Sequence, residues 1–365
     1  MPNQASGAAD WKDALFRYVS AMNEAALSRD SGVLKQIADI GQRDRLAKRM
    51  RVTIIRERRA GIKPLHSEIR TRIESHRANQ TEAVVDIALH AVRTFEQNGQ
   101  PWQEERIDRE RVKFVRTGQS WRLYAVQPLA SEWHPDVDFV IDASPSHDHA
   151  HAHASDSFKK TAAPSLPYIN PNAMYNFKSR VYAGSSLGAE DGFEQAWRAP
   201  YRRESAVAYA ERWWNEPNKT YEEFAVNCTN YVSQCIFAGG MPMDYTGRRE
   251  SGWWYKGRHQ NQEQWSYSWA VAHALQHHLS QPRAIGLRAE AVPRPDMLQL
   301  GDVICYDWDG SGRFQHNTIV TAFTPDGMPL VNANTVSSRH RYWDYRDSYA
   351  WTDRTQYRFF HITDE

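Results

Sequence analysis

The chain has little cysteine, no excess of charge of either sign and no long apolar run. Its 365 residues include three cysteines, too few for the disulfide framework of a small secreted domain. Lys and Arg total 45 and Asp and Glu total 44, so charge does not indicate nucleic acid or anionic lipid as the main partner. No segment approaches the roughly 18 apolar residues of a membrane-spanning helix.

The start of the chain, MPNQASGAAD, lacks the basic residues and apolar stretch of a signal peptide. If Cys228 and Cys235 lie on one helix, their Cα atoms are about 10 Å apart, which is beyond the ~7 Å reach of a disulfide. We therefore expect reduced thiols and a cytoplasmic protein, with export by another route left open.

The length predicts two domains. In residues 11–60 apolar side chains recur at helical spacing, for example Trp11, Leu15 and Tyr18. The period then changes to two, with polar turns at HRANQ, QNGQP and TGQS. This pattern predicts an antiparallel meander of about four strands. We expect residues 1–140 to form an α+β domain of helices plus meander, with an element order like that of cystatin-like and NTF2-like folds.

A stretch rich in Ser, Ala, Pro and His follows, SPSHDHAHAHASDSFKKTAAPSLP. Its composition predicts a flexible linker at residues 141–169. Four histidines alternate within it, at positions 147, 149, 151 and 153, which raises the alternative of a metal-binding tract. We favour the linker because no cysteine or carboxylate pair completes a coordination set.

Residues 170–365 read as a second α+β domain. Three amphipathic segments predict helices, and four short apolar runs predict strands of an antiparallel sheet. The Gly- and Asp-rich stretch DWDGSGRFQ is typical of a hairpin loop between two of the strands. The predicted helices are 202–217, 228 to about 237, and 268–279, and the predicted strands are 302–308, 317–323, 328–334 and 357–363.

The stretch NCTNYVSQC at residues 227–235 offers a candidate nucleophile. Asn227 is a good helix N-cap, and Thr229 suits a first turn, so Cys228 is predicted at the first helical position. Unpaired N–H groups and the positive end of the helix dipole lower a thiol pKa there. The same groups can bind the oxyanion of an acyl transfer. Cys235, inside the helix, has neither advantage and is predicted to be core.

A thiolate nucleophile needs a base and a residue that orients the base. His316 opens an apolar strand after a loop and is the best candidate base; His340 is the rival. Asn334 and Asn332 follow roughly one hairpin later, and either could orient the imidazole. The chain order Cys, His, Asn is that of papain-type enzymes, although order alone is a weak signal.

Two further motifs have competing interpretations. Trp253 and Trp254, in the run GWWYK, could form the wall of a groove for a peptide or glycan, or could pack in the core. Gly301 and Asp302 in LGDVICYDW form a turn before a strand, and we interpret them as structural.

Several blocks together resemble a known family. AVAYAERWWNEPN, YEEFAVNCTNYVSQCIFAGGMPM, SGWWY, SYSWAVAHAL, LGDVICYDWDG and QHNTIV are similar to the family known as the putative amidase domain, found in many spore-forming Gram-positive bacteria. The likeness covers about residues 170–365. It implies a papain-like fold related to NlpC/P60 and CHAP hydrolases, with Cys228 as nucleophile and His316 as base. The residue before the cysteine is commonly Asp in that family and is Asn227 in this chain.

The sequence thus predicts a thiol-dependent amide or peptide hydrolase that uses no cofactor and no metal. By analogy with related folds, the expected substrate is a peptide or a peptidoglycan-like stem or crosslink peptide, with neither nucleic acid nor membrane as partner. The alternative is a binding module that holds wall fragments or peptides in the same cleft without turnover. The oligomeric state is left undecided.

Overall fold

The computed structural model describes residues 10–132, 200–259, 262–283 and 286–363. These residues form two compact units: residues 10–132 with Tyr345–Trp351, and the described residues of 200–344 with those of 352–363. The predicted two-domain α+β class is confirmed. The predicted linker 141–169, its alternating histidines and the predicted boundaries at 140 and 170 lie outside the described residues.

The first unit consists of helices followed by an antiparallel meander, as the change of period from helical to two predicts. Asp39 caps the second helix by accepting from the backbone N–H of Gln42, and Gly61 ends it with a φ of 67°. Each strand pairs with the next along the chain. The elements are α1 (Trp11–Ser28), η1 (Ser31–Gln36), α2 (Ile40–Ala60), β1 (Lys63–Ala78), β2 (Glu82–Gln97), β3 (Gln100–Thr117) and β4 (Ser120–Pro128).

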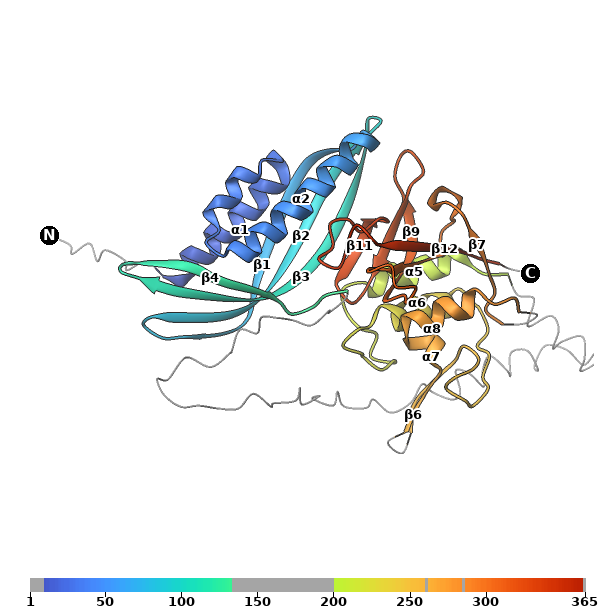
Figure 1. Cartoon of the computed structure of the whole chain (residues 1–365). Helices are drawn as coiled ribbons and strands as arrows, with labels where there is room; N and C mark the ends of the chain where they lie inside the picture. Colours follow the sequence, from blue (N-terminus) through green and yellow to red (C-terminus); the bar gives the residue numbers. More distant parts are fainter. Residues whose placement is uncertain (1–9, 133–199, 260–261, 284–285, 364–365) are drawn as a thin grey trace, which may run out of the picture. The chain divides into compact units, whose positions relative to one another are not determined.

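The core of this unit lies where α1 and α2 cover one face of the sheet (Figure 1). Helix α1 contributes Trp11, Leu15 and Tyr18, and the strands contribute apolar side chains such as Ile87 and Phe114. The helical spacing on α1 and the alternation on the strands therefore meet in one apolar layer.

The segment Tyr345–Trp351 was predicted to belong to the second domain but groups with the first unit. Arg106 Nη1 donates to Asp347 at 2.6 Å, and both side chains are buried. Gln42 Nε2 donates to the Tyr349 hydroxyl at 3.3 Å. These contacts join residues more than 200 positions apart, so local patterns could not reveal them.

In the described part of the second unit, helices α5 to α8 pack with an antiparallel sheet of strand order β11-β10-β9-β8-β12-β7, and β5 and β6 form a separate antiparallel pair. The predicted helix 268–279 is two short helices, and the strands β7 and β11 were not predicted. The elements are α5 (Arg203–Trp213), α6 (Cys228–Ala238), β5 (Tyr255–His259), β6 (Gln262–Trp265), α7 (Tyr267–Ala270), α8 (Ala272–Leu279), β7 (Ala289–Val292), η2 (Pro295–Met297), β8 (Val303–Asp307), β9 (His316–Phe323), β10 (Pro329–Ala333), β11 (Ser337–Tyr342) and β12 (Gln356–Ile362).

Gly301 and Asp302 have a structural role at the start of β8. Gly301 adopts a φ of 82°, a left-handed conformation that glycine adopts without strain. The fully buried Asp302 carboxylate accepts from Arg203 Nη1 at 2.7 Å and bonds to His361 Nδ1 at 2.8 Å. This carboxylate therefore joins α5, β8 and β12, which fixes the end of the sheet.

Candidate active site

Cys228 is the first residue of α6 and Asn227 is its N-cap, at the positions that the sequence predicts. The Asn227 side chain does not cap the helix, which corrects the expected role of its amide. Its Oδ1 instead accepts from Asn230 Nδ2 at 2.9 Å. Its Nδ2 donates to Asn334 Oδ1 at 2.7 Å. Asn227 therefore ties the turn before α6 to the segment after β10.

Thr335 supplies the hydrogen-bond acceptor at the start of α6. Its hydroxyl oxygen accepts from the backbone N–H of Asn227 at 3.1 Å and from that of Cys228 at 3.0 Å. Two backbone donors thus converge on one oxygen beside the candidate nucleophile. This is the arrangement that an oxyanion requires, with a protein hydroxyl as the acceptor.

His316 is the first residue of β9, paired in register with Tyr306 on β8. Its imidazole lies 5.5 Å from the Tyr306 ring and 5.7 Å from the Trp308 ring, centroid to centroid. The side chain is fully buried. Packing against two aromatic rings restricts the orientation of the imidazole.

The thiol of Cys228 is more acidic than an ordinary cysteine. Burial raises its pKa, and the neighbouring His316 is the main group that lowers it. A backbone hydrogen bond from Asn317 and the Thr229 hydroxyl act in the same direction, and the pKa falls from 9.0 to about 7. The imidazole is therefore close enough to the sulfur to stabilise the thiolate.

Thr229 and Asn317 support this pair from the helix and from the strand. The Thr229 hydroxyl lies 3.7 Å from Cys228 Sγ and accepts from Asn317 Nδ2 at 3.1 Å. Asn317 also donates to the carbonyl of Ala272 at 3.4 Å. These contacts hold the start of α6 against the start of β9.

The other two thiols behave differently. Cys235, inside α6, and Cys305, on β8, are both fully buried and unbridged. Burial raises the pKa of each thiol well above its ordinary value. The contrast with Cys228 comes from the neighbours of each sulfur, because all three side chains are buried.

The predicted orienting role of Asn334 or Asn332 needs correction. Asn334 Nδ2 donates to the carbonyls of Trp213 and Trp214, at 2.9 and 3.1 Å, and its Oδ1 accepts from Asn227 Nδ2. Asn332 Nδ2 donates to Glu211 on α5, and its Oδ1 accepts from the Thr321 hydroxyl on β9 and from the backbone N–H of His340 on β11. Each amide is thus engaged with groups other than His316. The hydrogen-bond partners of Asn332 and Asn334 depend on how β10 packs against α5, which the alternation of residues along the strand does not show.

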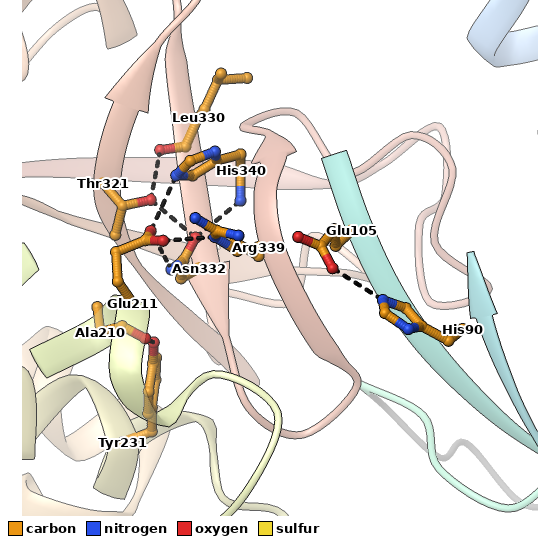
Figure 2. Close-up of polar contacts among 10 residues, drawn as sticks. All are labelled: His90, Glu105, Ala210, Glu211, Tyr231, Thr321, Leu330, Asn332, Arg339 and His340. Carbon is orange, nitrogen blue, oxygen red and sulfur yellow. Dashed lines mark hydrogen bonds and ion pairs between the residues drawn. The ribbon is translucent and has the colours of Figure 1, made fainter. Parts of the chain in front are cut away.

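The rival base His340 belongs to a separate polar cluster around Glu211 of α5 (Figure 2). Its Nε2 lies 2.9 Å from Glu211 Oε1, to which Asn332 Nδ2 also donates at 2.9 Å. Arg339 donates to the other carboxylate oxygen. Burial raises the pKa of Glu211, but these partners, His340 first, outweigh it and lower the pKa to about 2. The cluster joins α5 to β10 and β11.

Trp253 and Trp254 are core residues rather than exposed groove walls. They are 0% and 3% exposed, respectively. Trp253 Nε1 donates to Ser233 Oγ on α6 at 3.0 Å, and its ring lies 4.9 Å from that of Trp269. Of the two interpretations of GWWYK, packing is the one that the structure supports.

Sequence reasoning missed four residues of this site: Tyr306, Trp308, Asn317 and Thr335. Tyr306 and Trp308 lie in the run DVICYDW. Pairing that strand with the strand of His316 could have predicted that their rings lie near the imidazole. The position of Thr335 depends on how the chain leaves β10, for which no local signal exists.

These features define a candidate nucleophile and base held between a helix start and an antiparallel sheet. Residues 200–360 match the model of the family described as "Putative amidase domain", which confirms the predicted resemblance to that family. The match supports hydrolysis of an amide bond as the reaction class. The finer likeness to papain-like, NlpC/P60 and CHAP enzymes stays a prediction.

Two individual proteins are also similar. The Bacillus subtilis protein YhbB is 52% identical over 178 residues, which cover 48% of this chain and 55% of YhbB. The chain therefore spans about half the length of that relative. The intermembrane space region of the chloroplast protein ARC6 aligns with 33% of this chain and 95% of its own, at 13% identity and a TM-score of 0.25. That similarity is too low to establish a shared fold.

In the described part of the chain, no helix is both long and apolar enough to cross a membrane. Within the same residues, no group of three or more His, Cys, Asp and Glu side chains is arranged to hold a metal ion.

Proposed function

We propose that this protein is a thiol-dependent amide hydrolase in which Cys228 is the nucleophile and His316 the base. The observation that carries the proposal is the lowered pKa of the Cys228 thiol next to the His316 imidazole at the start of α6. Burial alone would raise a thiol pKa, as it does for Cys235 and Cys305. A specific ionising environment around one of three buried sulfurs is typical of a catalytic cysteine.

The reaction follows from this geometry. The thiolate attacks the amide carbonyl carbon, a C–S bond forms and the carbonyl electrons move to oxygen. His316, carrying the thiol proton, donates it to the amine nitrogen as the C–N bond breaks. His316 then takes a proton from water, which attacks the thioester and releases the acid and the free thiol.

The oxyanion needs donors next to the sulfur. The backbone N–H groups of Asn227 and Cys228 already converge on one oxygen, the Thr335 hydroxyl. A substrate carbonyl oxygen that replaced this hydroxyl would be bound by the same two donors. The proposal therefore includes displacement of Thr335 Oγ1 when substrate binds.

The reacting groups are closed to solvent, since Cys228 is 1% exposed and His316 is 0% exposed. Hydrolysis thus requires the site to open so that a substrate can reach the sulfur. By analogy with related folds, we propose a peptide of the peptidoglycan stem or crosslink type.

The test is turnover of such peptides by the full chain, read as release of a free amine. Cys228→Ser should lower kcat/KM by at least about 10³-fold, whereas Cys235→Ser, the matched control on the same helix, should retain activity in the folded protein. Equal activity of Cys228→Ser and wild type would overturn the assignment.

The same burial favours one alternative, a binding module without turnover. It predicts that peptides bind the full chain but are recovered intact after long incubation. It also predicts that Cys228→Ser binds them as tightly as wild type does. Release of amine that depends on Cys228 would exclude it.

A further inference from the structure

Strand β1 lies at the end of the sheet in the first unit. It is 16 residues long, well beyond the usual strand length of about 5–6 residues. In the described part of the chain, β2 is its only strand partner. Two register shifts interrupt that pairing, and residues 66–73 between them form one regular segment. The edge of this segment that faces away from β2 offers backbone N–H and C=O groups to another strand.

An open groove with a volume of about 650 Å³ lies between β1 and α1. Its lining includes neighbours on the strand, such as Glu68 and Ile69, whose side chains point to opposite faces. The groove therefore follows the edge of β1. Its apolar part includes two side chains with large exposed fractions, Phe16 of α1 at 73% and Ile73 at 40%. Exposed apolar side chains beside an unpaired strand edge are typical of a surface that another chain covers.

The two faces of the segment 66–73 differ in chemistry. Ser67 and Ile69 face α1, because Ser67 Oγ donates to Asn23 Oδ1 at 2.8 Å and Ile69 packs against the apolar core. Glu68 and Arg70 lie on the opposite face. Their side chains form an exposed ion pair, with Arg70 Nε 2.8 Å from Glu68 Oε1. A strand that pairs with this edge meets apolar side chains on one face and charges of both signs on the other.

A second copy of β1 matches these charges in one antiparallel register. With a two-fold axis at Ile69, Glu68 lies opposite the partner's Arg70, and the same pair recurs on the other side of the axis. Ile69 then lies next to the partner's Ile69, on the face toward α1. An axis at Arg70 or at Thr71 would instead place Arg70 opposite the partner's Arg70 or the partner's Arg72, and like charges directly opposite each other are destabilising. The segment is therefore self-complementary about Ile69.

We propose that two copies of this protein form a symmetric dimer in which their β1 strands pair antiparallel about Ile69. The sheet of the first unit then continues from one copy into the other, and the partner's strand covers the groove beside Phe16. Backbone hydrogen bonds and apolar contacts supply the affinity of such strand addition, and the Glu68–Arg70 pairs fix the register. This interface does not depend on the chemistry at Cys228.

The experiment is sedimentation velocity of the full chain over a series of concentrations at constant ionic strength. We expect the wild type to show a reversible equilibrium between monomer and dimer. Glu68→Arg and Arg70→Glu should each weaken self-association by about tenfold or more, because each places like charges opposite each other twice in the interface. An equimolar mixture of these two variants should recover the dimer, since each supplies the charge that the other lacks.

Glu74→Arg is the matched control on the same strand. The proposed register places Glu74 opposite the partner's Pro64, which is uncharged, so this variant should associate as the wild type does. Both Glu68 and Arg70 are exposed, so their variants should keep the circular dichroism spectrum of the wild type. A wild type that stays monomeric at every concentration overturns the proposal. A dimer that neither single variant weakens, or a mixture that fails to recover it, overturns it as well.

Discussion

At the residue scale, two buried acids show how neighbours decide a pKa. Both Cys228 and Glu110 are 1% exposed. For Cys228, the effects of His316, Asn317 and Thr229 outweigh burial, and the pKa falls to about 7. For Glu110, burial and then the charge of Asp108 raise the pKa, also to about 7, despite a hydrogen bond from the Tyr18 hydroxyl at 2.8 Å. Burial is common to both, so the partner sets the direction of the shift.

Glu110 makes the stability of the first unit depend on pH. Its folded pKa of about 7 lies above the ordinary 4.5, so the folded state holds a proton that the unfolded state releases between these values. The contribution of this group is complete below about pH 4.5 and is lost as pH rises through about 7. Glu110→Gln should flatten this part of the profile of urea midpoint against pH. Glu24→Gln, at an exposed position on α1, is the control, and an identical slope in Glu110→Gln and wild type would refute the assignment.

At the element scale, the start of α6 depends on a segment about 100 residues away. Thr335 accepts from the N–H groups of Asn227 and Cys228, and Asn334 holds the Asn227 amide. Asn334 also bonds to the last carbonyls of α5. The segment after β10 therefore connects the end of one helix with the start of the next.

Removing the Thr335 hydroxyl should leave two buried N–H groups without an acceptor. We expect Thr335→Val to lower the free energy of unfolding by about 1–3 kcal/mol, measured by urea denaturation. Thr335→Ser keeps the oxygen and should retain most of that stability. If valine and serine at this position were equally stable, the hydroxyl would not be the acceptor that holds the helix start.

The same scale shows what sequence patterns can and cannot predict. Helical spacing and alternation identified α1, α2 and β1 to β4. Helix α1 and strands β2 to β4 bury apolar residues in one core, and α2 and β1 pack partly buried apolar residues against it. The predicted helix 268–279 breaks at Val271, where the backbone is extended. Strand β11 was missed because SSRHRY has no alternating apolar face, and His340 within it adopts a φ of 52°.

In the candidate site, too, some features could be predicted from the sequence and others could not. A helix-start motif and the family resemblance identified Cys228 and His316 as the candidate nucleophile and base. In the structure, His316 lies near enough to Cys228 to lower the pKa of its thiol. The partners of Asn332 and Asn334 could not be predicted, because they lie on α5 and on the turn before α6. Such contacts depend on the register of β10 and on helix packing, which local patterns do not encode.

At the scale of the whole molecule, the chain has two compact units, each with its own core. Phe114 belongs to the core of the first, and Asp302 joins α5, β8 and β12 in the second. Neither residue is near Cys228 in sequence. Because each unit has its own core, a substitution in one core can be tested separately from a substitution in the other.

We expect two calorimetric unfolding transitions, because chains of more than one domain depart from two-state behaviour. Phe114→Ala should lower one of them, by about 3–5 kcal/mol. Asp302→Asn should lower the other by a similar amount, about 3–5 kcal/mol, because it leaves Arg203 without its buried counter-charge. A single transition that both variants lower equally would contradict two independent cores.

The central claim is that His316 makes the Cys228 thiol acidic. The most direct measurement is the rate of iodoacetamide labelling of each cysteine in the native full chain, followed by mass spectrometry from about pH 5 to 10. We predict that Cys228 reacts faster than Cys235 and Cys305, with a half-maximal rate near pH 7. His316→Gln should move this midpoint toward 9.0, the ordinary value for a thiol, whereas His340→Gln should not. Equally slow labelling of all three thiols, or a Cys228 profile that does not change in His316→Gln, would contradict the account.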